Sequence, residues 1–212
     1  MPARKSNPPL LNVKTLTVGE MAENCHFVFD KNFKEAVIID PGDEADYIEK
    51  VINDLELTPA LIVATHGHLD HVMAVFELKL AYNIPFYMNR KDDFLLQRLP
   101  QTAKHFGKVE AFPVSIDKNL GDGDVLKIGG SPFFVIETPG HTPGSITLAS
   151  KEANIAFVGD LIFEGGAIGR TDFSYSSKEK LTASLSKIAK LPPDTKIFPG
   201  HGANFTLSRF GT

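Results

Sequence analysis

One short segment decides the class of this protein: Thr65-His66-Gly67-His68-Leu69-Asp70-His71. It follows the apolar run 61–64 and precedes an amphipathic run, so it lies where a strand ends and a helix begins. In an extended turn, side chains at positions i and i+2 project to one side, which lets His66 and His68 converge on one ion. Asp70 and His71 then lie at the helix start and point toward a neighbouring position.

The composition of this cluster favours a metal site. Neutral imidazole and carboxylate are ligands of divalent ions. Without a cation, such a cluster is energetically unfavourable because its members repel one another. Each residue alone has a simpler interpretation. Asp70 would be a helix N-cap, and a lone histidine at a strand end is more often a structural hydrogen-bonding residue.

Three further side chains of the ligand type come shortly after apolar runs. These runs end at residues 136, 158 and 198, and they are followed by His141, Asp160 and His201. Glycines adjoin each of the three residues and let the backbone turn tightly near an ion. The sequence therefore predicts one site built from several strand ends.

The alternation of short apolar runs with amphipathic ones predicts an α/β protein. Strands are expected at 11–18, 26–29, 36–40, 60–65, 85–88, 111–115, 125–128, 133–138, 145–149, 154–158 and 195–198. Helices are expected at 43–55, 70–82, 91–104 with a break near Pro100, and 177–190. No linker, repeat or low-complexity stretch divides the sequence, so we expect a single domain over residues 1–212.

Charge and composition narrow the range of partners. With 22 basic and 26 acidic residues and a net charge of −4, the chain gives no electrostatic reason to expect nucleic acid or an anionic membrane as partner. No apolar run exceeds five residues, against the roughly 18–20 that cross a bilayer. Cys25 is the single cysteine, and no signal-peptide apolar region follows the N-terminus. We expect a cytoplasmic monomer or small homo-oligomer that acts on a small molecule.

The HxHxDH motif, followed by a separate His, Asp and His, resembles the signature of the metallo-β-lactamase superfamily, and all seven positions are filled. The resemblance covers nearly the whole chain. It implies a four-layer αββα sandwich with the site at one edge of its two sheets. It also implies a ligand set for two metal ions: His66, His68 and His141 for the first, Asp70, His71 and His201 for the second, and Asp160 as the bridge.

Within that superfamily, the stretch 159–173 resembles the glyoxalase II group, which comprises hydroxyacylglutathione hydrolases and short bacterial relatives. Full-length members carry a C-terminal helical domain that binds glutathione. The sequence stops eleven residues after His201, so the resemblance implies the short form. Class B β-lactamases commonly use a cysteine ligand and are exported, whereas Cys25 lies far from the motif.

The implied activity is hydrolysis of thioesters such as S-acylglutathione by a metal-bridging hydroxide. Two divalent ions can lower the pKa of a shared water from about 15.7 toward 7. Asp70 is expected to orient this hydroxide as a catalytic residue. Arg170 is expected either to bind a substrate carboxylate or to pair with Asp172. Nitrogen and oxygen ligands accept zinc, the expected metal, and also iron or manganese.

Other functions remain open at this stage. An iron-dependent persulfide dioxygenase shares the fold and uses the equivalents of His66, His141 and Asp160. A lactonase and a non-catalytic metal-binding protein are further alternatives. Outside the motifs, we expect Asp40 to serve a turn rather than a ligand loop. We assign Cys25, His26 and His105 to packing or the surface, and Asp172 is considered only as the partner in the second of the two roles expected for Arg170.

Overall fold

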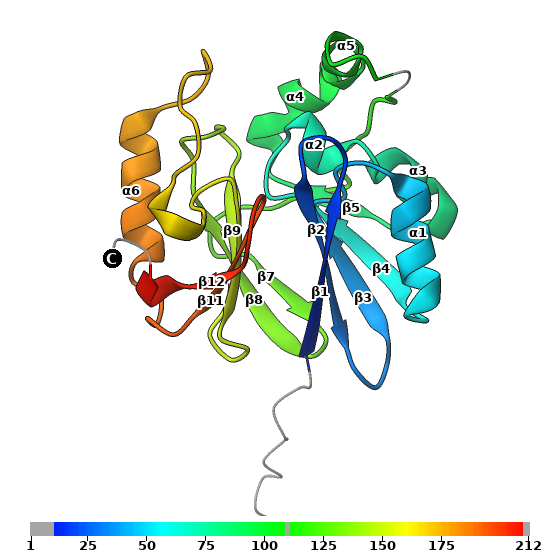
Figure 1. The fold of residues 1–212 in the computed structure, drawn as a ribbon, viewed down its shortest axis with the longest axis horizontal. Coiled ribbons are helices and arrows are strands. Elements are labelled where there is room, and N and C mark those ends of the chain that lie inside the picture. The colour runs from blue at the N-terminus through cyan, green and yellow to red at the C-terminus, as the bar shows by residue number, and fades with distance from the viewer. Residues whose placement is uncertain (1–10, 109–110, 210–212) are drawn as a thin grey trace, which may run out of the picture.

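In the computed structural model, which describes residues 11–108 and 111–209, the strands form two six-stranded sheets (Figure 1). The first sheet runs in sequence order and contains β1 (Leu11–Val18), β2 (Glu23–Asp30), β3 (Glu35–Ile39), β4 (Thr58–Val63), β5 (Phe86–Met88) and β6 (Lys118–Asn119). Its first three strands pair antiparallel, and β3 to β6 pair parallel.

The second sheet has the order β12-β11-β10-β9-β8-β7. Its strands are β7 (Val125–Ile128), β8 (Ser131–Glu137), β9 (Ile146–Ser150), β10 (Ile155–Gly159), β11 (Lys196–Pro199) and β12 (Phe205–Thr206). Only β10 and β11 pair parallel.

Helices cover the outer faces of both sheets. Figure 1 shows α1 and α3 beside the first sheet and α6 beside the second. The helices are α1 (Ala45–Asp54), α2 (Leu69–Val72), α3 (Val75–Tyr82), α4 (Asp93–Gln97), α5 (Leu99–His105) and α6 (Lys178–Ile188), and the 3-10 turns are η1 (Arg90–Asp92), η2 (Glu164–Gly166) and η3 (Leu207–Arg209).

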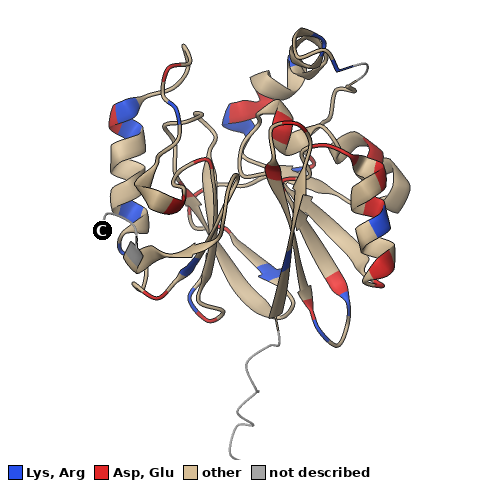
Figure 2. Ribbon diagram, viewed as in Figure 1, with Lys and Arg blue, Asp and Glu red and all other residues tan. Residues whose placement is uncertain are grey.

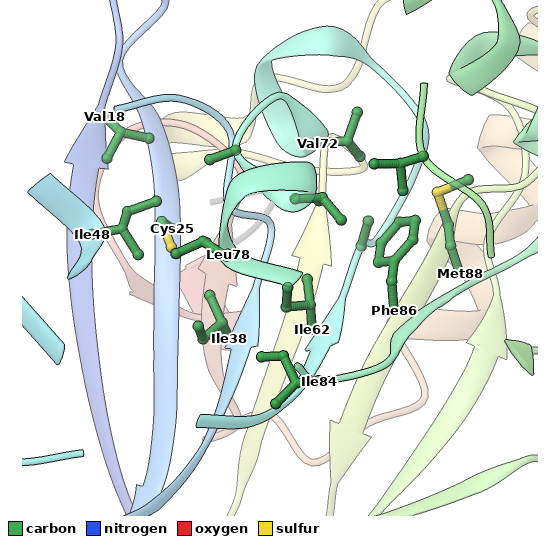
Figure 3. Packing of buried hydrophobic residues seen from close by; sticks show 14 of the residues in the cluster. Val18, Cys25, Ile38, Ile48, Ile62, Val72, Leu78, Ile84, Phe86 and Met88 are labelled. Carbon is green, nitrogen blue, oxygen red and sulfur yellow. The ribbon is translucent and has the colours of Figure 1, made fainter. Parts of the chain in front are cut away.

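Strand periodicity explains the layers. Successive side chains point to opposite faces, so Ile38 packs under the helices while its neighbour Ile39 packs between the sheets. The outer cluster of the first sheet joins Ile38 to Ile48 of α1 and Leu78 of α3 (Figure 3). Val63 of the first sheet and residues of the second, among them Phe133, Leu148 and Phe157, form the core between the sheets.

A third cluster packs β9 and β10 against Leu181 and Ile188 of α6. The order is thus helix, sheet, sheet, helix, which confirms the predicted αββα sandwich. In Figure 2 most acidic and basic residues lie on helices, loops and strand ends, away from the central strands.

Two predicted elements are wrong. The expected strand at 111–115 is irregular, because Pro113 cannot donate to a ladder, and the pairing with β5 is made by β6 instead. The expected helix 70–82 is broken into α2 and α3. Ala74 N donates to the Pro41 carbonyl rather than to its own helix, so the loop at Pro41 ends α2.

The break in the helical stretch after residue 91 falls at Arg98, slightly before the expected Pro100. Pro100 lies in the first turn of α5, where its missing N–H costs nothing because that position has no helical acceptor. Other predicted bounds agree within two or three residues, except that two-residue strands β6 and β12 were not predicted.

Candidate metal centre

The seven predicted ligands gather at one edge of the two sheets, in loops that follow the carboxyl ends of strands. β4 of the first sheet leads into the HxHxDH segment, and β8, β10 and β11 of the second lead to the other three residues. Within each of three groups the ligand atoms lie within 4.8 Å of one another: His66, His68 and His141; Asp70, His71 and His201; His66, His71 and Asp160.

The first group consists of three imidazoles. His68 Nδ1 lies 3.1 Å from His66 Nε2 and 2.9 Å from His141 Nε2, so three ring nitrogens face a common point. Burial lowers the pKa of His68 to about 3, and burial together with His71 lowers the pKa of His66 well below its usual value. Both rings are therefore neutral near pH 7, the form in which imidazole binds a metal.

The second group adds a carboxylate to two imidazoles. Asp70 Oδ2 lies 3.2 Å from His201 Nε2 and 3.8 Å from His71 Nε2. Burial opposes ionisation of Asp70, but His71 and His201 hold its pKa below the usual range. The carboxylate is thus ionised and available as an anionic ligand.

Asp160 lies between the two groups. Its Oδ1 is 3.5 Å from His71 Nε2 and 3.7 Å from His201 Nε2, whereas its Oδ2 is 3.6 Å from His141 Nε2. One carboxylate oxygen therefore faces each group, as the predicted bridging role requires.

The buried polar atoms at this edge fit bound cations. His71 Nε2 and Asp160 Oδ1 are buried without a hydrogen-bond partner among the described residues. Leaving such a group unpaired costs about 1–3 kcal/mol. Burial lowers the pKa of His71, yet the surrounding carboxylates, Asp160 first, raise it well above its usual value. The site thus attracts positive charge, and its nitrogen and oxygen donors fit two divalent ions.

Backbone carbonyls orient the imidazole rings of His141 and His201. His141 Nδ1 donates to the Arg170 carbonyl at 2.9 Å, and His201 Nδ1 donates to the Met21 carbonyl at 3.1 Å. A carbonyl only accepts, so each bond places the hydrogen on Nδ1 and leaves Nε2 free to bind a metal.

Asp40 corrects one expectation. Rather than serving a turn alone, it accepts hydrogen bonds from Thr65 N at 2.6 Å and Thr65 Oγ1 at 2.7 Å, and its Oδ2 lies 3.1 Å from His71 Nδ1. Thr65 Oγ1 is also 3.1 Å from His66 Nδ1. Asp40 therefore fixes the loop that carries His66 through its hydrogen bonds with Thr65, although it is not one of the seven predicted ligands.

Asp92 was missed by sequence reasoning. Its buried carboxylate accepts from Gly67 N at 3.0 Å, Thr142 Oγ1 at 2.6 Å and Gly144 N at 2.6 Å. These donors belong to the loops that carry His68 and His141. Asp92 sits in an ordinary charged run with Asp93, so no signal in the sequence sets it apart.

A cavity of about 750 Å³ opens onto the ligand groups. Its wall is mainly apolar and includes Met21, Leu95, Leu99, Phe106, Phe163 and Phe173. Arg170 lines the cavity and also pairs with Asp172 through two bonds of 2.9 and 2.7 Å, so both of its expected roles remain open. His26 is buried and His105 exposed, in line with the roles expected for them outside the site.

Comparison with known proteins agrees with this geometry. The sequence profile described as the metallo-beta-lactamase superfamily matches residues 18–201. The chain therefore belongs to the metallo-β-lactamase superfamily. It is 38% identical over 203 residues to hydroxyacylglutathione hydrolase GloC of Haemophilus influenzae, and the match covers 94% of each chain.

Two solved structures are also similar. BLEG-1, described as a B3 metallo-β-lactamase, has a TM-score of 0.86 and 32% identity, and the match covers 93% of this chain and 95% of the other. TTHA1623 in a di-iron-bound form has a TM-score of 0.83 and 34% identity, with 92% and 95% covered. The chain is thus a metallo-hydrolase with relatives of the glyoxalase II group. No helix in the described part of the chain is long and apolar enough to cross a membrane.

Proposed function

We propose that this protein is a dinuclear metallo-hydrolase of small acyl-thioesters such as S-acylglutathione. The observation that carries the dinuclear part is Asp160, whose two oxygens face different ligand groups. The thioester part is supported by the similarity to GloC, a hydroxyacylglutathione hydrolase. We propose zinc as the metal, and the di-iron neighbour makes iron the first alternative.

Two divalent ions, when bound, would lower the pKa of a water toward neutrality and polarise the acyl carbonyl. The protein supplies the positioning. Asp70 is proposed as the catalytic residue that orients the attacking water, because its ionised carboxylate can accept a hydrogen bond from it. The leaving thiolate needs no acid, since a thiol pKa of about 8.5 lets it depart unprotonated.

The cavity is proposed to hold the substrate beside the ligands. Its volume of about 750 Å³ suits a small molecule, and its apolar wall suits the aliphatic part of the acyl group or carrier. Arg170 is proposed to bind a carboxylate of the carrier with the part of its guanidinium fork that Asp172 leaves free.

The proposal also includes a reducing compartment such as the cytoplasm. The single cysteine supports this location, because proteins of oxidising compartments commonly carry paired cysteines. Cell fractionation tests it.

Metal analysis and substrate assays on the same preparation test the proposal. Protein purified without added metal is analysed for metal per chain and assayed with S-lactoylglutathione, with a lactone and a β-lactam as comparison substrates. Oxygen uptake with glutathione persulfide is measured in parallel. Near two metals with preferential thioester turnover supports the proposal. One iron with oxygen uptake would replace it with the dioxygenase function, and turnover of only the lactone or β-lactam would change the substrate class.

A further inference from the structure

Tyr175 touches the first ligand group although the proposed chemistry does not use it. Its hydroxyl lies 2.9 Å from His68 Nε2, and its half-buried side chain lines the cavity. The ring is stacked on Phe173, with centroids 5.3 Å apart and planes 8° from parallel, and Phe94 meets its edge at 5.3 Å. Aromatic contacts on two sides thus fix where the hydroxyl points.

The segment that carries Tyr175 is itself tied to the second histidine loop. Ser176 Oγ donates to the His141 carbonyl at 2.7 Å, and Ser177 N donates to the Gly140 carbonyl at 2.8 Å. The carbonyl of Arg170, at the start of the segment, accepts from His141 Nδ1. One loop therefore orients His141 through the backbone and reaches His68 through a side chain.

The protonation of His68 sets the direction of the bond to Tyr175. His68 Nδ1 faces His66 and His141, which makes Nδ1 the atom that would bind the metal. A neutral imidazole carries one hydrogen, so that hydrogen then lies on Nε2. His68 Nε2 donates, and the tyrosine oxygen accepts.

The tyrosine proton is then left for another acceptor. Burial raises the pKa of the Tyr175 hydroxyl above its usual value, so the hydroxyl keeps its proton at neutral pH. It makes no other hydrogen bond with the described residues. The cavity is the open space next to it.

We propose that Tyr175 is a positioning residue of the metal centre: its hydroxyl accepts from His68 Nε2 and so fixes the ring and tautomer of His68, which leaves Nδ1 free to bind the metal. This inference rests on the metal-binding part of the proposed function and not on its thioester part.

The test compares Tyr175→Phe with a matched control, Tyr47→Phe, at a tyrosine on α1 that is 45% exposed. Phenylalanine keeps the stack on Phe173 and removes only the oxygen. Zinc affinity is measured by competition with a chromogenic chelator. Loss of a partner that orients a ligand typically costs 10- to 100-fold in affinity, so we expect a fall of at least about tenfold in Tyr175→Phe and no change in the control. Equal affinity in all three proteins would overturn the positioning role.

Kinetics at saturating zinc separate this role from a direct contact with substrate. Once zinc fills the site, we expect kcat and KM of Tyr175→Phe for S-lactoylglutathione to match those of the wild type, because the hydroxyl lies on the opposite side of the His68 ring from Nδ1. A fall of about tenfold or more in kcat at full zinc occupancy would overturn a role confined to metal binding. If even the wild-type protein fails to hydrolyse thioesters, the proposed function falls, while zinc affinity still decides the role of Tyr175.

Discussion

Asp92 joins the two histidine loops of the metal centre through three hydrogen bonds from Gly67, Thr142 and Gly144. All three partners are donors, and a carboxylate is the side chain that can only accept. Gly144 also needs to be glycine, since a Cβ there would lie 2.6 Å from Asp92 Cγ. The positions of His68 and His141 in the first ligand group thus depend on Asp92, which is not itself a ligand.

Replacing Asp92 by Asn should disturb both folding and metal binding. The new amide directs N–H groups at donors, so we expect a loss of about 2 kcal/mol in the free energy of unfolding of metal-free protein and at least about tenfold in zinc affinity. Urea unfolding and chelator competition measure the two effects. Asp93→Asn at the next position is the control, and equal effects of both substitutions would contradict the role of Asp92.

His201 tests whether the second ligand group binds its own ion. His201→Ala removes one of the three members of that group, so we expect metal content to fall from near two toward one per chain and thioester turnover to fall by about 100-fold or more. His105→Ala, at an exposed histidine on α5, should change neither quantity. Retention of both metals and full activity in His201→Ala would contradict the dinuclear site.

The ligands themselves could be predicted from the sequence because their residue types and spacing carry the signal. Asp40 and Asp92 could not, since an aspartate in a turn or in a charged run has the same local appearance whether it is solvated or buried. Tyr175 was not predicted for the same reason, since it is distinguished only by its contact with His68 Nε2 in the folded protein.

At the level of the element, the loop at Pro41 and Gly42 shapes the helix that carries Asp70 and His71. The Pro41 carbonyl takes the N–H of Ala74 and ends α2, while Gly42 packs against the backbone of Asp70. An amphipathic pattern extends without interruption across this break, so periodicity predicted one helix. The competing bond comes from a loop about 30 residues earlier in the chain, which periodicity cannot reveal.

Gly42→Ala should therefore displace this loop. A Cβ at Gly42 would overlap the Asp70 carbonyl oxygen, so we expect a loss of about 3 kcal/mol in stability and weaker zinc binding. Gly121→Ala is the matched control, because nothing lies closer than 3.9 Å to a Cβ there. Thermal unfolding and chelator competition measure the effects, and similar behaviour of the two variants would refute the close packing.

His26 on β2 makes stability depend on pH. Its Nε2 lies 3.3 Å from the Pro199 carbonyl of β11, and burial lowers its pKa to about 4. The unfolded chain, with a pKa near 6.5, takes up the proton first as pH falls, so stability is lost between about pH 6.5 and 4. Between pH 7 and 5 this loss amounts to about 2 kcal/mol in metal-free protein. Unfolding of His26→Gln should show a shallower pH dependence by that amount, and an identical one would contradict the assignment.

For the whole molecule, the four layers followed from the alternation of strands and helices together with the family resemblance. The strands at two sheet edges, β6 and β12, could not be predicted, because each has only two residues and so short a strand leaves no periodic pattern in the sequence. The position of each ligand after a strand end predicted one shared site. The pairing of distant segments that brings these strand ends together, such as β10 with β11, was indicated only by the resemblance.

Removing metal should destabilise the molecule as a unit. At free metal about 1,000 times its dissociation constant, each bound ion adds about 4 kcal/mol to stability. For a protein of this size that corresponds to roughly 10 °C in Tm. We propose a single domain, so calorimetry should show one transition in both forms, shifted down by chelator. Two separated transitions would contradict the single domain, and an unshifted Tm would contradict tight metal binding.

The order of the strands determines how the ligand residues are divided between the two halves of the chain. All strands of the first sheet precede residue 120, and all strands of the second follow residue 124. The first half therefore carries the HxHxDH residues, and the second half carries His141, Asp160 and His201. Neither half holds all three members of any of the three ligand groups described above. Two separately expressed fragments cut near Gly123 would therefore have to reassociate before this site exists, and metal binding would measure their complementation.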